Sequence, residues 1–101
     1  MKPLIPFETT ISGEVQGGTI VATQLPNIPC SMVKIKALSN NTGSVYIGGE
    51  GVTVPGAATN ETAGYELDAG EALEWIPISN LNKLWLICDN NGDDITYIAF
   101  R

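Results

Sequence analysis

Apolar and polar residues alternate with a period of two along most of the chain, and this spacing predicts β-strands rather than helices. In the run 30–38, for example, Val33 and Ile35 share one face while Lys34 and Lys36 share the other. Gly or Pro interrupts the chain at intervals of about ten residues, which leaves little room for an α-helix. The pattern predicts an all-β domain, a small antiparallel β-sandwich or barrel of about eight short strands.

Two apolar runs near the C-terminus, 84–88 and 95–100, flank the polar segment 89–94. The Asn and Gly residues of this segment suit a tight reversal, so we predict that the two runs pair as a β-hairpin. Each run is apolar on both faces, unlike a strand with one face in water. One face is therefore expected in the core, and the other face needs a cover.

A second β-hairpin is predicted near the N-terminus, where the segments 9–15 and 19–25 flank a Gly-Gly turn. The polar, glycine-bearing segment 50–63 is expected to form a long surface loop with a short strand at 52–54. Ordered loops of this length are often contact regions. Further short strands are expected at residues 44–47, 65–67 and 72–78.

Residues 1–8 contain two prolines, which cannot donate to a sheet ladder, so we expect an extended arm outside a domain of residues 9–101. Apolar side chains on such an arm suit docking onto the chain's own sheet or onto a neighbouring subunit, and a frayed terminus is the alternative. The apolar side chains of the arm are Leu4, Ile5 and Phe7.

Alternation within each strand also predicts which side chains face the core. The expected core residues are Val33, Ile35, Val45, Ile47, Leu73, Trp75, Leu84, Leu86, Ile95 and Tyr97. Large exposed apolar patches are uncommon on soluble monomers, so we expect the opposite face of the C-terminal hairpin to contact a partner. That face carries Trp85, Ile87, Ile98 and Phe100.

The charge and the hydropathy of the chain restrict its partners. The 101 residues include 11 acidic and 5 basic ones, and the net charge of −6 repels the phosphates of nucleic acids and anionic membranes. No apolar run approaches the roughly 20 residues needed to span a bilayer. The N-terminus lacks the apolar stretch and cleavage site of a signal peptide, so we expect synthesis in the cytoplasm.

The sequence contains no histidine, the commonest general base and metal ligand, and this excludes most hydrolase mechanisms. The two cysteines, Cys30 and Cys88, lie at apolar runs, where burial keeps a thiol protonated and inert. Two buried free thiols are favoured over a long-range disulfide, which the spacing also allows. We expect no enzymatic activity.

Carboxylates are the remaining candidates for chemistry. The segment 89–94 has oxygen-rich spacing that suits calcium, but it is short and lacks the distal glutamate of a full calcium loop, so a plain turn is favoured. The carboxylates between residues 66 and 74 are expected to face solvent rather than each other across a cleft, as a glycosidase pair requires. We expect no bound metal and no cofactor.

Aromatic side chains suggest a different function, a platform on which a sugar ring stacks. Trp75 and Tyr97 are in phase with the predicted core, which leaves Trp85 and Tyr46 as candidates for such a platform. A carbohydrate-binding module is therefore an alternative to a subunit of a larger assembly.

From residue 43 onward the chain carries, in order, SVYIGGEGVT, a variable loop, GYELDAGEALEW, LNKLWLIC and ITYIAFR. This order resembles small β-sandwich proteins of tailed bacteriophage particles. In those proteins a VYVGG-type strand and turn precedes an L-x-x-G-E hairpin, a leucine-rich LNKLYVI strand and a final short strand. The first 30 residues of the chain are not matched.

The resemblance implies a non-enzymatic virion component, a capsid decoration or cement protein that sits on the outer surface of a phage head and reinforces it. The implied partners are the major capsid protein, further copies of the chain in a homo-oligomer such as a trimer, or both. The implied location is the capsid surface, after synthesis in the host cytoplasm. A carbohydrate-binding module of a tail or fibre is the alternative.

Overall fold

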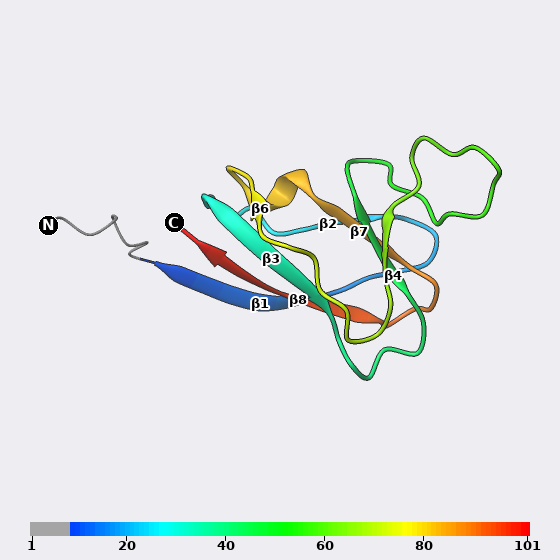
Figure 1. Ribbon diagram of the computed structural model, residues 1–101, viewed down its shortest axis with the longest axis horizontal. Helices are drawn as coiled ribbons and strands as arrows, with labels where there is room; N and C mark the ends of the chain where they lie inside the picture. The colour runs from blue at the N-terminus through cyan, green and yellow to red at the C-terminus, as the bar shows by residue number, and fades with distance from the viewer. Residues whose placement is uncertain (1–8) are drawn as a thin grey trace, which may run out of the picture.

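Two antiparallel β-sheets pack face to face in the computed structural model, which describes residues 9–101 (Figure 1). The predicted all-β sandwich is therefore confirmed, while the arm expected at residues 1–8 lies outside the described residues. The elements are β1 (Thr10–Gln16), β2 (Thr23–Gln24), β3 (Met32–Ala37), β4 (Val45–Gly48), β5 (Tyr65–Leu67), β6 (Ile76–Pro77), the 3-10 turn η1 (Leu81–Lys83), β7 (Trp85–Cys88) and β8 (Asp94–Phe100).

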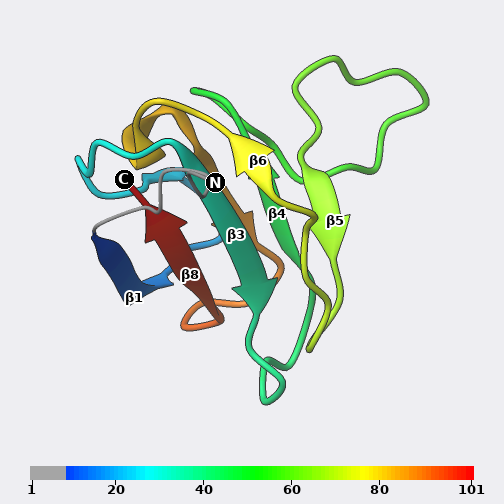
Figure 2. The same cartoon turned by 60° about the vertical axis from the view of Figure 1, so that its left-hand side comes forward.

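The order of the strands is that of an eight-stranded jelly roll. Sheet A has the order β1-β8-β3-β6, and sheet B has the order β2-β7-β4-β5. Every connection between consecutive strands crosses from one sheet to the other, except the connection from β4 to β5. Figure 2 shows β1, β8 and β3 side by side in one layer, with β4 and β5 in the other. Two nested Greek keys give this arrangement.

Both predicted hairpins are wrong in their pairing. The strands β7 and β8 belong to different sheets, and so do β1 and β2, so each polar segment between them bridges the two layers instead of closing a ladder. Two strands that face each other across a core show the same period-two pattern as two hydrogen-bonded neighbours. The pattern therefore identifies each strand and its inner face but not its partner.

The core fills the space between the two sheets. Two of the ten predicted core residues, Leu73 and Leu84, are partly buried and pack against it. Seven more are buried within it, namely Val33, Ile35, Val45, Ile47, Leu86, Ile95 and Tyr97.

Trp75 is the core prediction that is wrong, because 40% of its surface is exposed. Along β3, Val33 lies opposite Ile76, whereas Lys36 lies opposite Ala72. On β3, two residues lie between Val33 and Lys36. Three residues lie between their partners, Ala72 and Ile76, so the partner segment contains one extra residue. An extra residue of this kind forms a bulge and turns the following side chains to the other face. Trp75 therefore lies outside the sandwich.

The outer face of sheet B is covered by the chain itself. Val52 packs there against Tyr46 and Ile87, and all three side chains are buried. Val52 belongs to the long connection 49–64, which contains the segment 50–63 that the sequence predicted as a surface loop. A Cβ at Gly64 would lie 2.6 Å from the Cβ of Tyr46, so only glycine allows the loop to return so close to β4. The loop 49–64 of the same chain thus covers the outer face of β7.

A buried carboxylate joins the β3–β4 connection to the β7–β8 connection. The backbone N–H groups of Thr42 and Gly43 donate to the carboxylate of Asp93 at 3.1 and 2.9 Å, and the Thr42 hydroxyl adds a contact of 3.3 Å. The side chain of Asn41 exchanges two hydrogen bonds with the backbone of Asp94, at 2.8 and 3.0 Å. These contacts hold together two connections that cross between the sheets at the same end of the sandwich.

We expect Asp93→Ala to lower the free energy of unfolding by about 3 kcal/mol, because it leaves two backbone N–H groups without their charged acceptor. Urea denaturation measures the change. The control Glu50→Ala removes an exposed carboxylate and is expected to stay within about 0.5 kcal/mol of the wild type. A loss at Asp93 no larger than that of the control would contradict the role of this carboxylate.

Candidate interaction surface

The outer face of sheet A gathers apolar side chains that the sandwich leaves outside its core. Phe100 and Ile98 of β8 lie directly opposite Met32 and Lys34 of β3. Pro77 of β6 lies opposite Met32 on its other side, so Phe100, Met32 and Pro77 form one row across the sheet. No loop comparable to 49–64 lies over this face in the described part of the chain (Figure 1). The side chains on this face are mostly partly buried.

Trp75 lies at the centre of this arrangement. Its ring centroid is 5.2 Å from that of Phe100, with the two rings tilted by 30°. The Nζ atom of Lys34 lies 5.9 Å from the centroid of the Trp75 ring, within the range of a cation–π contact. We define the sheet A patch as Met32, Lys34, Lys36, Trp75, Ile98 and Phe100.

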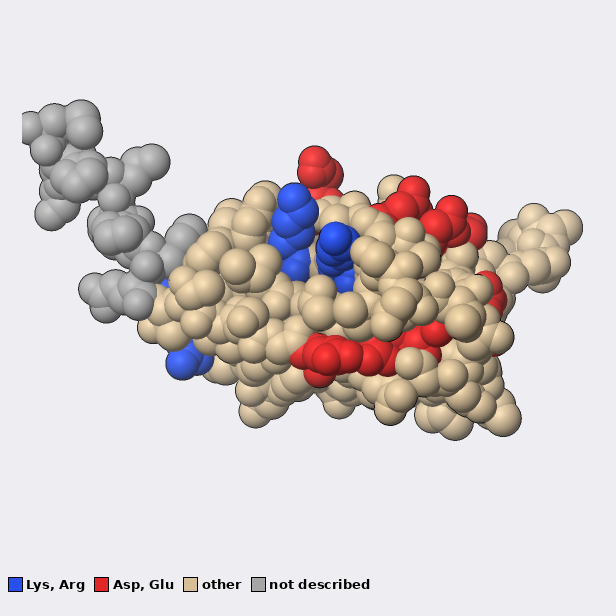
Figure 3. Space-filling model, turned by 90° about the horizontal axis from the view of Figure 1, so that it is seen from below, with Lys and Arg blue, Asp and Glu red and all other residues tan. Residues whose placement is uncertain are grey.

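The sheet A patch is locally basic on an acidic protein. Lys34 and Lys36 project from the same side of β3, although the chain carries a net charge of −6. Figure 3 shows two basic side chains next to each other, with acidic side chains on both sides of them. Among residues 9–101, neither lysine forms an ion pair with a carboxylate. The patch thus combines apolar surface with two positive charges that are available to a partner.

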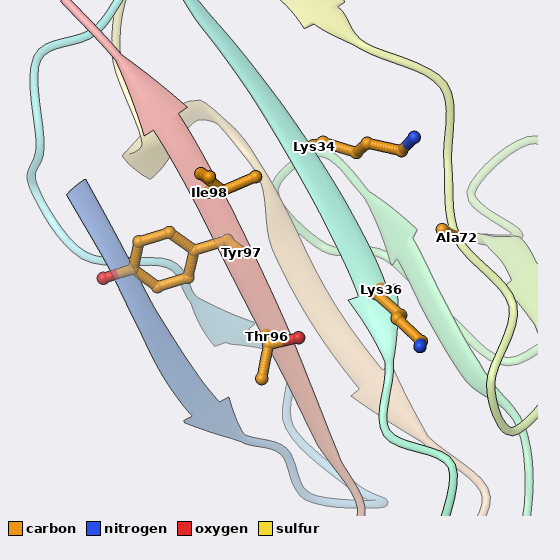
Figure 4. Close-up of a pocket in the computed structure, with 6 residues that line it drawn as sticks. All are labelled: Lys34, Lys36, Ala72, Thr96, Tyr97 and Ile98. Carbon is orange, nitrogen blue, oxygen red and sulfur yellow. The ribbon is translucent and has the colours of Figure 1, made fainter. Parts of the chain in front are cut away.

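A shallow hollow of about 330 Å³ lies beside the two lysines (Figure 4). Tyr97 points from it toward β1, and the lysine side chains extend toward the segment that carries Ala72. The remaining lining residues are Thr96 and Ile98 of β8. The hollow offers cationic and apolar groups and the hydroxyl of Thr96, a set that suits binding of an anionic group, and no carboxylate is among its lining residues.

The four residues expected to form one contact face lie on two opposite faces. Ile98 and Phe100 lie on the sheet A patch and are partly exposed. Trp85 and Ile87 lie on the outer face of sheet B, where Ile87 is only 4% exposed. The expectation that Ile87 offers surface to a partner is therefore wrong, because Val52 covers it. Leu4, Ile5 and Phe7, also expected to make contacts, lie outside the described residues.

The structure also changes the candidates for an aromatic platform. Tyr46 is 6% exposed and donates its hydroxyl hydrogen to the Asp89 carboxylate, 3.0 Å from both oxygens, so it is no platform. Trp75, which sequence reasoning placed in the core, is exposed on the sheet A patch. The adjacent apolar pair of Trp75 and Ile76 was the available signal, since neighbours in a strand point to opposite faces and one of the two had to face outward.

The carboxylates of the segment 89–94 are engaged within the protein. Asp93 accepts hydrogen bonds from the β3–β4 connection, and Asp89 accepts them from Tyr46 and from the backbone N–H of Ser44. Among residues 9–101, no group of three or more His, Cys, Asp or Glu side chains could hold a metal ion. The segment therefore has a structural role at the end of the sandwich.

The two cysteines are buried and unbridged, as predicted. The thiol of Cys30 donates to the carbonyl oxygen of Ile78 at 3.3 Å, and that of Cys88 donates to the carbonyl of Asp93 at 3.6 Å. Burial raises the pKa of both thiols, and that of Cys88 reaches about 11 with added repulsion from nearby aspartates. Neither thiol is therefore a reactive nucleophile near neutral pH.

In comparisons with known proteins, no family model, no curated protein and no solved structure matches the chain. In residues 9–101, no helix is long and apolar enough to cross a membrane.

The raised pKa values of Cys88 and Tyr46 predict a loss of stability at alkaline pH. Burial raises the pKa of Cys88 from 9.0 to about 11, and burial with the Asp89 contact raises that of Tyr46 from 10.0 to about 12. A raised pKa means that the folded state favours the neutral form. The stabilisation is complete below the unfolded-state pKa and is lost as the pH rises through the folded-state value.

We therefore expect the free energy of unfolding to fall between pH 9 and 12. In Cys88→Ala the fall below pH 11 should be smaller, because one of the groups that titrate in this interval is absent. Urea denaturation at a series of pH values measures both curves. Parallel curves for the two proteins would contradict the assigned contribution of Cys88.

Chelation tests whether the segment 89–94 is a plain turn. Because Asp89 and Asp93 already accept internal hydrogen bonds, we expect EDTA to leave the melting temperature unchanged at matched ionic strength. Added calcium is likewise expected to cause no increase. A fall of several degrees with EDTA, reversed by calcium, would identify a stabilising metal site instead.

Proposed function

We propose that the chain is a non-enzymatic structural subunit of a virion, a capsid decoration protein that binds the outer surface of a phage head and stabilises it. The observation that carries this proposal is the sheet A patch, where the exposed ring of Trp75 lies beside two lysines on a face that no loop covers within residues 9–101. Contiguous apolar surface with aromatic residues is typical of protein interfaces. The order of motifs from residue 43 onward supports the same function.

The chemistry of the patch indicates what the partner surface must offer. The exposed ring of Trp75 needs an apolar surface to cover it, and Lys34 and Lys36 need carboxylates beside that surface. A capsid surface of this composition would place its acidic groups against the only two adjacent basic residues of the described chain. The acidic remainder of the subunit would then face solvent, which keeps the decorated particle soluble.

The two outer faces have different parts in this proposal. The outer face of sheet B is occupied by the loop 49–64, so it contributes little apolar surface to a partner. The hollow of about 330 Å³ on sheet A is open to solvent rather than enclosed, so this face can contact another protein.

Co-sedimentation with purified heads of the phage that encodes the chain tests the proposal. Trp75→Ala removes a central aromatic side chain of the patch and is expected to weaken binding by about 2 kcal/mol, roughly thirtyfold. The matched control is Tyr65→Ala, which removes an aromatic residue of 66% exposure from β5, in the other sheet. Thermal melts check that both variants are folded.

The wild-type protein and the Tyr65 variant are expected to bind heads equally and to raise the temperature at which the heads disassemble. Absence of wild-type binding would overturn the proposed function. Equal binding by the wild type and Trp75→Ala would overturn the placement of the contact on the sheet A patch.

The exposure of Trp75 supports a second candidate function, a carbohydrate-binding module of a tail or fibre. A tryptophan ring can stack on a sugar, and Lys34 and Lys36 beside the hollow favour a sugar that bears a carboxylate. Titration with acidic and neutral oligosaccharides would then quench tryptophan fluorescence in the wild type but not in Trp75→Ala. Quenching of this kind without binding to heads would replace the decoration proposal.

A further inference from the structure

Among the strands of residues 9–101, β1 lies at an open edge of sheet A. Thr9 and Arg101 exchange two backbone hydrogen bonds, each of 3.1 Å, just beyond the ladder between β1 and β8. Hydrogen-bonded and non-hydrogen-bonded pairs alternate in an antiparallel ladder, so the odd-numbered residues of β1 bond to β8. The backbone N–H and C=O groups of the even-numbered residues point away from β8, toward the open side. These residues are Thr10, Ser12, Glu14 and Gln16.

The edge at β1 lacks the devices that usually protect a sheet edge. Its pairing with β8 runs without a bulge from Thr10 opposite Phe100 to Gln16 opposite Asp94. The strand contains no proline and no lysine, and Glu14 is its only charged residue. Proline, lysine, bulges and short length are the features that normally discourage edge-to-edge pairing. A regular seven-residue edge without them is a ready template for another strand.

The other three edges are protected by their short length. The strands β2 and β6 have two residues each, and β5 has three. In addition, β6 contains Pro77, which cannot donate a hydrogen bond. The open edge at β1 is thus distinct among the four edges of the described sandwich.

The inner side of β1 is incompletely covered. Ile11 and Val15 pack against the core but are only partly buried, because no strand of the described sandwich lies beyond β1. A further strand on this edge would cover both side chains while it satisfied the outward-pointing backbone groups. Backbone pairing and apolar burial therefore both favour the same type of contact.

We propose that two copies of this chain associate through their β1 strands, which pair in antiparallel orientation about a twofold axis. The two four-stranded A sheets then form one continuous eight-stranded sheet. A twofold axis at Ser12 or Gly13 places Glu14 opposite the partner's Thr10 or the partner's Ser12, so the two glutamates do not face each other. Twofold contacts between identical edges are self-complementary. The inference goes beyond the proposed function, because it concerns the edge of sheet A and not its outer face.

Sedimentation velocity of the full chain, without heads, measures the association over a range of concentrations. Ser12→Pro removes an N–H that points to solvent in the monomer, a position at which an edge strand tolerates proline. In the dimer each copy would lose one hydrogen bond, so the dissociation constant is expected to rise by roughly tenfold or more.

Amide hydrogen exchange supplies a second reading that depends on the wild type alone. As the protein concentration rises, the amides of Thr10, Ser12 and Glu14, which pair with the partner strand under either axis, should become protected. Those of the odd-numbered residues of β1 should not change, because they already bond to β8. This alternation is specific to edge pairing, and it decides the question if the proline variant does not fold.

The control is the double variant Ile20→Ser and Val21→Ser, which removes two highly exposed apolar side chains, of 88% and 74% exposure, from the β1–β2 connection. It should dimerise as the wild type does. A monomeric wild type at all concentrations, a dimer that persists in folded Ser12→Pro, or a dimer lost in the double variant but not in Ser12→Pro would each overturn the proposal. None of these outcomes bears on binding to heads through the sheet A patch.

Discussion

The fold depends on the insertion of its last two strands into the middle of the two sheets. The strand β7 lies between β2 and β4, and β8 lies between β1 and β3. Without them each sheet would lose its central ladder, and its remaining strands would have few partners. The native structure therefore requires contacts between the two ends of the chain. A topology dominated by such distant contacts is expected to fold slowly compared with a helical domain of similar size.

The same constraint explains how much of the fold the sequence could predict. The positions of the strands and the inward direction of Val33, Ile35 and Ile95 follow from local alternation, and all three are buried. The assignment of strands to sheets is not local, because a segment that turns back within a sheet and one that crosses to the other sheet use the same Asn and Gly residues. Both hairpin predictions failed at this step.

The candidate surface was predicted in part. Ile98 and Phe100 lie on an outer face as their phase indicated, but Trp75 joins them only because of one extra residue in the segment before β6. Ile87 has the right phase for an outer face, yet a loop distant in sequence covers it. A period-two pattern gives the direction of a side chain. It does not reveal what lies above that side chain, which tertiary contacts decide.

The loop 49–64 has a further consequence that follows from its closed base. Thr53 and Thr62 share a hydrogen bond of 2.8 Å between their hydroxyls, and the backbone N–H groups of Thr53 and Gly64 donate to the carbonyls of Thr62 and Thr53, both at 2.9 Å. The tip beyond this closure, 55–59, is fully on the surface (Figure 2). Because closure entropy rises only slowly with loop length, we expect the tip to accept foreign peptide without disturbing the sandwich. The domain is in this respect a scaffold for display.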